Sequence, residues 1–226
     1  MIGNGPSLLM SDLDRLQGEI SIAANKIYRA FPLARWRPDY YCVIDEVMAR
    51  NIQAESPDLP SPRLYSYEAA QVLGMDERSL MVMTLPLPED PALALETGFS
   101  DDLERGAYPG SSVTIFALQL AAHLGAREAI LLGVDFSYAP GRPTPETSAY
   151  SGPIMLSQGE SNHFCADYLR PGERFTEPKL GEQREAFRRA RRYFEARGGR
   201  LINASRETRL DVVERASLEE ALAGRY

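Results

Sequence analysis

The residues best suited to chemistry lie near the start of the chain, in the turn Gly3-Asn4-Gly5-Pro6-Ser7-Leu8. Glycines allow a tight turn and a close approach of the backbone to a ligand. The N–H groups at the start of a following helix attract anions, and Asn4 and Ser7 add neutral donors that suit a nucleotide or a sugar. The turn is therefore either a nucleotide-binding loop or an ordinary connection from strand to helix.

Three other polar residues are expected at the same edge of a parallel sheet. Asn25, Asp45 and Asp135 each follow an apolar segment that is typical of a buried strand. Ligands of open parallel sheets bind beyond the carboxyl ends of the strands. Each residue alone could equally be a helix N-cap or a turn residue, but together they favour a binding edge.

A second anion site is expected at Gly110-Ser111-Ser112, which begins a long helix predicted over Ser111–Leu124. The hydroxyls and N–H groups there could cap the helix, bind a phosphate, or do both.

His163 is the candidate general base, because an imidazole exchanges protons near neutral pH. Tyr138, Tyr150 and Tyr168 lie in the same region, where they could donate to a departing phosphate or simply pack together. The other histidine, His123, is expected to cap or pack at the end of the long helix.

Metal chemistry is not expected. Two histidines and two scattered cysteines give no zinc-binding spacing, and no Gly-Lys-Ser/Thr phosphate loop is present. Acidic residues that could hold Mg²⁺ are expected instead at the surface or in helix caps; they are Asp12, Asp14, Asp45, Glu46, Asp101 and Asp102.

Composition limits the class of protein. With 226 residues, 44% of them hydrophobic, the chain can form a single domain with a large core. A net charge of -7 argues against a nucleic-acid partner. Cys42 and Cys165 lie in apolar or aromatic surroundings, which is typical of a reduced, cytoplasmic protein. No membrane-spanning run and no signal peptide are expected.

The pattern of apolar runs predicts an α/β, Rossmann-like fold, with a mostly parallel sheet and helices on both faces. The expected strands are Ile20–Ala24, Tyr40–Ile44, Leu80–Thr84, Ala129–Val134 and Arg200–Ile202, and a second surface helix is expected over Glu182–Arg197. Only Met1 and Ile2 precede the glycine turn, so we expect a native first strand that begins a few residues earlier.

Two segments interrupt this alternation of predicted strands and helices. Residues 139–181 are rich in Pro, Gly, Ser and Tyr and carry His163, which favours a lid-like insertion. The Pro-rich segment Ser56–Arg63 is expected to be a surface connection.

The order of these motifs resembles the bacterial sialyltransferases of glycosyltransferase family 42. It also resembles the wider DUF115 group, which includes flagellin-modifying glycosyltransferases and archaeal MptE-type pterin pyrophosphokinases. The motifs that carry the resemblance are Gly3–Leu8, Asn25-Lys26-Ile27-Tyr28, the segment from Leu124-Gly125-Ala126 to Gly133-Val134-Asp135-Phe136, and Asn162-His163-Phe164.

The sialyltransferase resemblance implies a metal-independent enzyme that uses a CMP-activated acidic sugar and needs no cofactor. His163 would deprotonate the acceptor, and Tyr138, at a different offset from the family's tyrosines, would assist the leaving phosphate. Asp45 stands where the sialyltransferases have asparagine, which leaves the donor sugar open. The expected nucleotide site is Gly3, Asn4, Gly5, Pro6, Ser7, Asn25, Asp45, Gly110, Ser111, Ser112 and Asp135.

The sequence therefore predicts a glycosyltransferase of surface glycans or flagellin with a glycan or glycolipid acceptor. It would be cytoplasmic or peripheral at the inner face of the membrane, and it could be a homo-oligomer. One alternative is a pterin pyrophosphokinase that uses ATP and Mg²⁺, although the acidic and histidine-rich segments of that branch are reduced here to Asp45-Glu46 and His163. Another is a non-catalytic nucleotide-binding protein.

Overall fold

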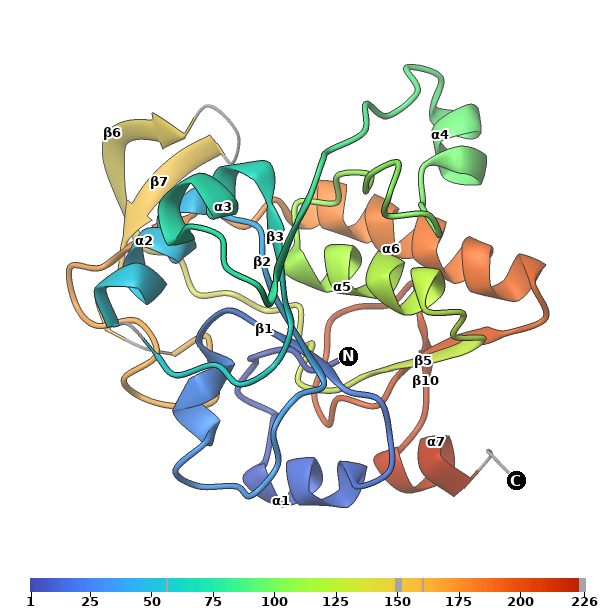
Figure 1. The fold of residues 1–226 in the computed structure, drawn as a ribbon, viewed down its shortest axis with the longest axis horizontal. Helices are drawn as coiled ribbons and strands as arrows, with labels where there is room; N and C mark the ends of the chain where they lie inside the picture. Colours follow the sequence, from blue (N-terminus) through green and yellow to red (C-terminus); the bar gives the residue numbers. More distant parts are fainter. Residues whose placement is uncertain (56, 149–151, 160, 224–226) are drawn as a thin grey trace.

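The computed structural model describes residues 1–55, 57–148, 152–159 and 161–223, and a parallel sheet runs through its centre (Figure 1). On one side β1 (Ile22–Ala24), β2 (Tyr40–Val43), β3 (Arg63–Ser66) and β4 (Ser79–Val82) pair in that order. On the other side β5 (Glu128–Leu131) pairs with β9 (Arg200–Asn203), and β9 pairs with β10 (Glu214–Arg215).

The first residues of the chain join these two halves. Ile2 makes parallel bridges to Ala23 and to Leu132. The N–H of Ile2 donates to Ile22 O at 2.8 Å, and the N–H of Gly3 donates to Leu132 O at 2.7 Å. Strand order therefore runs outward in both directions from residues 1–3. This arrangement creates a topological switch point, where doubly wound folds bind their ligands.

Helices cover both faces of the sheet, because successive strand residues point to opposite sides. Ala23, Tyr41 and Val43 belong to the core on one face, whereas Ile22, Ala24 and Cys42 belong to the core on the other. The first face is covered by α1 (Met10–Leu13), η1 (Asp14–Leu16), η2 (Asn25–Ala30), α2 (Glu46–Glu55), α3 (Tyr67–Leu73) and α7 (Leu218–Ala223). The second is covered by α5 (Val113–His123) and α6 (Leu180–Ala196), with α4 (Pro91–Thr97) against α6. This layering confirms the expected Rossmann-like α/β fold.

The two helices expected from the sequence are α5 and α6. Ser112 caps α5 by accepting from the N–H of Thr114. In α6 a stripe of Ala186, Phe187, Ala190 and Phe194 is buried between charged side chains, as its amphipathic pattern predicts. None of the helices in the described part of the chain is long and apolar enough to cross a membrane.

Some element boundaries differ from the sequence-based expectation. β5 ends at Leu131 rather than Val134, because Gly133 adopts a φ of +68° and turns the chain. Ile20 is 72% exposed and lies outside β1. The expected connection over residues 56–63 leads directly into β3 at Arg63, a strand that the sequence reading missed; residue 56 itself lies outside the described residues.

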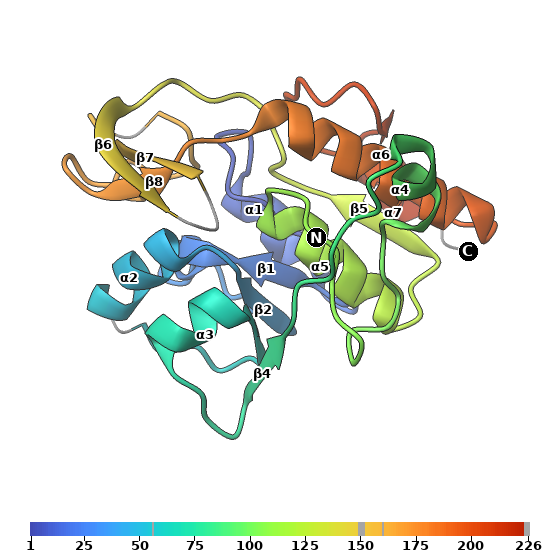
Figure 2. The same ribbon diagram turned by 90° about the horizontal axis from the view of Figure 1, so that it is seen from above.

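The segment 139–181 contains a small antiparallel sheet of β6 (Arg142–Ser148), β7 (Gly152–Leu156) and β8 (Arg174–Thr176), beside α2 (Figure 2). The Nδ2 of Asn51 donates to Arg174 O at 2.8 Å, and the hydroxyl of Ser148 donates to Glu46 Oε1 at 2.6 Å. β6 carries prolines at 143 and 145 and shows no alternation of buried and exposed residues, so no strand pattern is visible there in the sequence. Tyr150 lies outside the described residues.

Residues 1–3 form a short central strand between the two halves of the sheet. Its close packing predicts that two glycine substitutions differ in their effect on stability. A Cβ on Gly3 would lie 2.4 Å from Gly133 O, whereas a Cβ on Gly181 would meet nothing within 4 Å. We expect Gly3→Ala to cost about 1–3 kcal/mol, which lowers the Tm of a domain of this size by roughly 2–4 °C per kcal/mol. Gly181→Ala should leave the Tm unchanged or raise it slightly. Equal melting temperatures for the two variants would contradict the close backbone packing.

Candidate functional site

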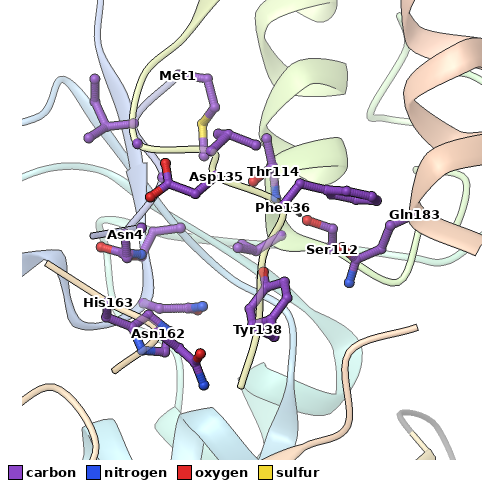
Figure 3. A pocket seen from close by; sticks show the side chains of 18 of the residues that line it. Met1, Asn4, Ser112, Thr114, Asp135, Phe136, Tyr138, Asn162, His163 and Gln183 are labelled. Carbon is purple, nitrogen blue, oxygen red and sulfur yellow. Dashed lines mark hydrogen bonds between the residues drawn. The ribbon is translucent and has the colours of Figure 1, made fainter. Parts of the chain in front are cut away.

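A cavity of about 90 Å³ lies at the switch point, beyond the carboxyl ends of the central strand and β5 (Figure 3). Its walls come from separate segments of the chain: residues 1–5, the end of β1 at residues 24–25, the start of α5, residues 133–138, Asn162 with His163, Tyr168, and two residues of α6. In Figure 3 Asn4 and Asp135 form one side, with His163 and Asn162 on another and Tyr138 between them and Ser112. The fold thus brings residues that are far apart in the sequence to one place.

A larger cavity of about 520 Å³ adjoins the first, and Asn25, Ser112, Tyr138 and His163 line both. Apolar side chains form much of its wall, including Ile44, Met48, Phe116, Leu169 and Phe175. Its charged groups are mainly acidic, with Asp45, Glu68 and Glu177 against the ammonium of Lys179.

The opening turn is fixed against the end of β5. The N–H of Gly5 donates to Gly133 O at 2.8 Å, and a Cβ on Gly5 would lie 2.6 Å from Asp135 Cγ. The N–H of Ser7 donates to Asp135 Oδ2 at 2.8 Å, and the Ser7 hydroxyl donates to Oδ1. Burial raises the pKa of Asp135, and these two bonds from Ser7 partly offset the rise. Asp135 therefore serves first to hold the turn.

Two amide side chains present unsatisfied acceptors. Asn4 Nδ2 donates to Ala24 O at 3.1 Å, which orients the amide. The Oδ1 atoms of Asn4 and Asn25 are both buried and have no hydrogen-bond partner within the described residues. A buried acceptor without a donor is costly. Both residues line the switch-point cavity, so a ligand with N–H or O–H groups would satisfy them.

The backbone is strained at this site. Among the described residues, Asn25, Ser111 and Phe136 are the non-glycine residues with positive φ, at 53°, 51° and 54°, and all three line one or both cavities. Such conformations persist where the surroundings impose them, often at functional sites. Here Tyr41 Oη donates to Asn25 O at 2.5 Å, and Gln183 Nε2 donates to Ser111 O at 2.7 Å.

The start of α5 faces both cavities. Ser112 and Val113 line both, and Thr114 lines the smaller one. The preceding loop is held by Arg189, whose Nη2 donates to Pro109 O at 3.0 Å. Gly110 is needed because a Cβ there would lie 2.5 Å from Ile115 Cγ2. The N–H groups and positive dipole end of this helix suit a phosphate.

His163 is placed by its neighbours rather than by its own loop alone. Its ring stacks on Tyr168, with centroids 3.8 Å apart and an angle of 10° between the planes. The N–H of Phe164 donates to Asn4 O at 2.9 Å. The segment that carries the candidate base is therefore bonded directly to the opening turn.

Beneath the site lies an ion cluster that the sequence analysis did not anticipate. Lys26 is completely buried, and its Nζ lies 2.7 Å from Glu55 Oε1 and 3.0 Å from Glu173 Oε2. Arg29 pairs with Glu55 at 2.8 Å and also with Asp167. Burial alone would raise the pKa of Glu55, but hydrogen bonds from Lys26, Tyr28 and Arg29 outweigh it and hold that pKa below 4.5.

The structure gathers most of the predicted site. The residues that line one or both cavities are Gly3, Asn4, Gly5, Asn25, Asp45, Gly110, Ser111, Ser112, Asp135, Tyr138 and His163. Pro6 and Ser7 line neither. Asp45 also caps α2, since its Oδ1 accepts from the N–H groups of Val47 and Met48. His123 accepts from the N–H of Leu103 at 3.3 Å, away from both cavities.

Within the described residues, no group of three or more His, Cys, Asp or Glu side chains is arranged to hold a metal ion.

Residues 1–141 match the family described as 6-hydroxymethylpterin diphosphokinase MptE-like. The chain belongs to this MptE-like family. The match confirms the resemblance to the MptE and DUF115 group, whereas the likeness to sialyltransferases stays a prediction. Comparisons with curated proteins and with solved structures gave no match. The matched part of this MptE-like chain contains the opening turn, Asn25, Gly110–Ser112 and Asp135; His163 lies beyond it.

The buried cluster predicts how stability depends on pH. Because the pKa of Glu55 is lower in the folded state, its stabilisation is present above pH 4.5 and is lost as the pH falls through the folded pKa. Removing one partner of a buried ion pair typically lowers the free energy of unfolding by about 3–5 kcal/mol. For Glu55→Gln at pH 7 we expect a loss near the lower end of this range, because Glu173 still pairs with Lys26. The free energy of unfolding of the variant should also fall less on acidification than that of the wild type, as measured by urea unfolding at several pH values.

Glu195→Gln is the matched control, because Glu195 pairs with Arg191 on the exposed face of α6. Surface pairs contribute about 0–1 kcal/mol. A pH dependence of Glu55→Gln equal to that of the wild type would contradict the assignment.

Proposed function

We propose that this MptE-like protein is a transferase that binds a nucleotide at the switch point and moves a group from it to an acceptor hydroxyl. The observation that carries the proposal is the convergence, in one cavity, of two unpartnered amide oxygens, a helix start and an imidazole. The amides suit a base or a ribose, the helix suits a phosphate, and His163 suits proton transfer.

The preferred donor is a CMP-activated acidic sugar. Asn4 Oδ1 and Asn25 Oδ1 would accept from the amino group of the base or from ribose hydroxyls, which are neutral donors. The single phosphate would rest on the N–H groups at the start of α5, near Ser112 and Thr114. Neutral acceptors, together with one helix start, match a nucleoside monophosphate better than a chain of phosphates.

The transfer step needs one base and one leaving group. His163 would take the proton from the acceptor hydroxyl as its oxygen bonds to the anomeric carbon of the donor. The bond from that carbon to the phosphate oxygen breaks, and the electron pair leaves with CMP. Tyr138, which lines both cavities, would donate a hydrogen bond to the departing phosphate.

The larger cavity is the natural place for the acceptor, because His163 lines it as well as the nucleotide cavity. Its apolar side chains would pack against the faces of sugar rings. Its carboxylates, Asp45, Glu68 and Glu177, would accept from hydroxyls and disfavour an acidic acceptor.

The family match favours a second candidate, transfer of diphosphate from ATP to 6-hydroxymethylpterin. His163 would play the same part, since the acceptor is again a hydroxyl. Magnesium in phosphoryl-transfer sites is commonly held by one or two carboxylates and by the phosphates. The carboxylates that line the larger cavity are Asp45, Glu68 and Glu177, and one or two of them would supply this, with the phosphates completing the ligand set.

A panel of CMP, CDP, UDP, GDP and ATP, each with and without Mg²⁺, separates the candidates by thermal shift. A ligand at 100 times its Kd stabilises the native state by about 2.7 kcal/mol. We expect CMP to raise the Tm without Mg²⁺, whereas ATP that acts only with Mg²⁺ would favour the diphosphokinase. A Tm that no nucleotide moves would contradict both.

Asn25→Gly is the matched variant for this panel, because glycine tolerates the positive φ of 53° but lacks the amide. We expect it to bind CMP about tenfold more weakly, which corresponds to about 1.4 kcal/mol, with little change in the Tm of the free protein.

The role of His163 is tested by His163→Phe, which keeps a ring on Tyr168 but removes the base. Release of CMP from a CMP-sugar in the presence of acceptor should fall by about 10²–10⁴-fold, with CMP binding retained. His123→Gln, distant from the cavities, should turn over like the wild type. Turnover by His163→Phe at the wild-type rate would rule out this base.

A further inference from the structure

We propose that the single peptide group between Asn25 and Lys26 fixes the candidate base relative to the nucleotide site, with Tyr168 as the positioning residue for His163. The inference rests on the proposed function for its catalytic consequence, but its geometry is independent of any substrate.

This peptide group is held on both sides by buried tyrosine hydroxyls. Its carbonyl, Asn25 O, accepts from Tyr41 Oη at 2.5 Å. Its N–H, on Lys26, donates to Tyr168 Oη at 3.3 Å. Tyr41 and Tyr168 are 0% and 1% exposed. Hydrogen bonds from two directions in a dry environment leave the peptide plane little freedom to rotate.

On its N-terminal side the clamped peptide supports Asn25. That residue has a left-handed conformation with a φ of 53°, which asparagine adopts more readily than most side chains, and the bond from Tyr41 helps to hold it. This conformation accompanies the placement of the Asn25 side chain at both cavities. A nucleotide that bonds to Asn25 Oδ1 would therefore bind a preset group.

On its other side the clamped peptide supports His163 through Tyr168. The imidazole lies nearly parallel to the phenol ring, with 3.8 Å between centroids, and Phe164 packs edge-on against the same ring at 6.0 Å. Tyr168 thus provides a flat surface that sets the plane of the base.

The ammonium of Lys26 anchors the rest of this segment. Glu173 Oε2 accepts from Lys26 Nζ at 3.0 Å and from the N–H of Arg170 at 3.0 Å. Lys26 therefore bonds through its backbone to Tyr168 and through its side chain to Glu173. One residue ties both parts of the loop beneath His163 to the strand end that carries Asn25.

The consequence is a fixed spacing between the amide of Asn25, in the proposed nucleotide site, and the imidazole of His163. A misplacement of about 1 Å in a reacting group can cost on the order of 10²-fold in rate. Tyr168 itself lines the smaller cavity beside His163, but the amides of Asn4 and Asn25 remain when its ring is removed. Loss of the aromatic surface should therefore lower kcat more than it lowers nucleotide affinity.

Nuclear magnetic resonance of ¹⁵N,¹³C-histidine-labelled protein tests the geometry without any substrate, because the chain has 2 histidines. His123→Gln assigns the His163 signals. A ring stacked face to face should shift the imidazole protons upfield. We expect Tyr168→Phe to keep this shift, and Tyr168→Leu and Tyr168→Met to lose it; the Met variant serves if the Leu variant does not fold. An unchanged shift in the folded non-aromatic variants would overturn the proposal.

Kinetics then tests the consequence. For Tyr168→Leu or Tyr168→Met we expect kcat with a CMP-sugar to fall by about 10–10²-fold, while the Kd for CMP stays within about threefold. Tyr168→Phe keeps the aromatic surface but removes the hydroxyl that accepts from the N–H of Lys26, so its kcat should lie between those of the wild type and of Tyr168→Leu. A wild-type kcat in this variant would overturn the role of the peptide group. Equal losses in kcat and in CMP affinity would indicate general disruption and overturn the positioning role. If the non-aromatic variants lose the shift as expected but the wild-type protein turns over no CMP-sugar, the result would count against the proposed function alone.

Discussion

The whole arrangement depends on a backbone contact between Gly3 and Gly133. Two half-sheets meet over a central strand of only a few residues, and that strand ends where Gly3 and Gly5 lie against the chain leaving β5. Because no side chain separates the two backbones, the opening turn and the 133–138 segment share one crevice. The Ser7–Asp135 bonds then fix the turn, so the position of Asn4 follows from packing rather than from a ligand.

A second constraint is electrostatic. Lys26 is a fully buried cation that satisfies carboxylates from α2 and from the segment after β7. Burying an ammonium without partners would be prohibitive, so the folded state must bring Glu55 and Glu173 together around it. The segment that carries His163 is thereby attached by charge to the chain that follows β1, in addition to the apolar packing of Tyr168 and Leu169 in the main core.

Much of this could be predicted from the sequence, and the failures have identifiable causes. Apolar runs identified most of the central strands, and polar residues at their ends identified Asn25 and Asp135, since strand polarity fixes which ends meet. The small sheet was missed because β6 carries two prolines and lacks the alternation of buried and exposed residues that marks a strand. The role of Lys26 was missed because a lysine in sequence signals an exposed residue. The contacts of Tyr168 and Tyr41 join residues far apart in the chain, which no local pattern reports.

The family match stops at residue 141, and β6 begins at the next residue. The switch-point strands, both glycine-rich turns and Asn25 lie before that boundary. Asn162, His163, Phe175 and Lys179 reach the cavities from beyond it. The site is therefore a composite of a part that the family match covers and a part that it does not. Under the function that we propose, the part before residue 141 would hold the donor nucleotide, whereas the part after it would supply the base and one wall of the acceptor cavity.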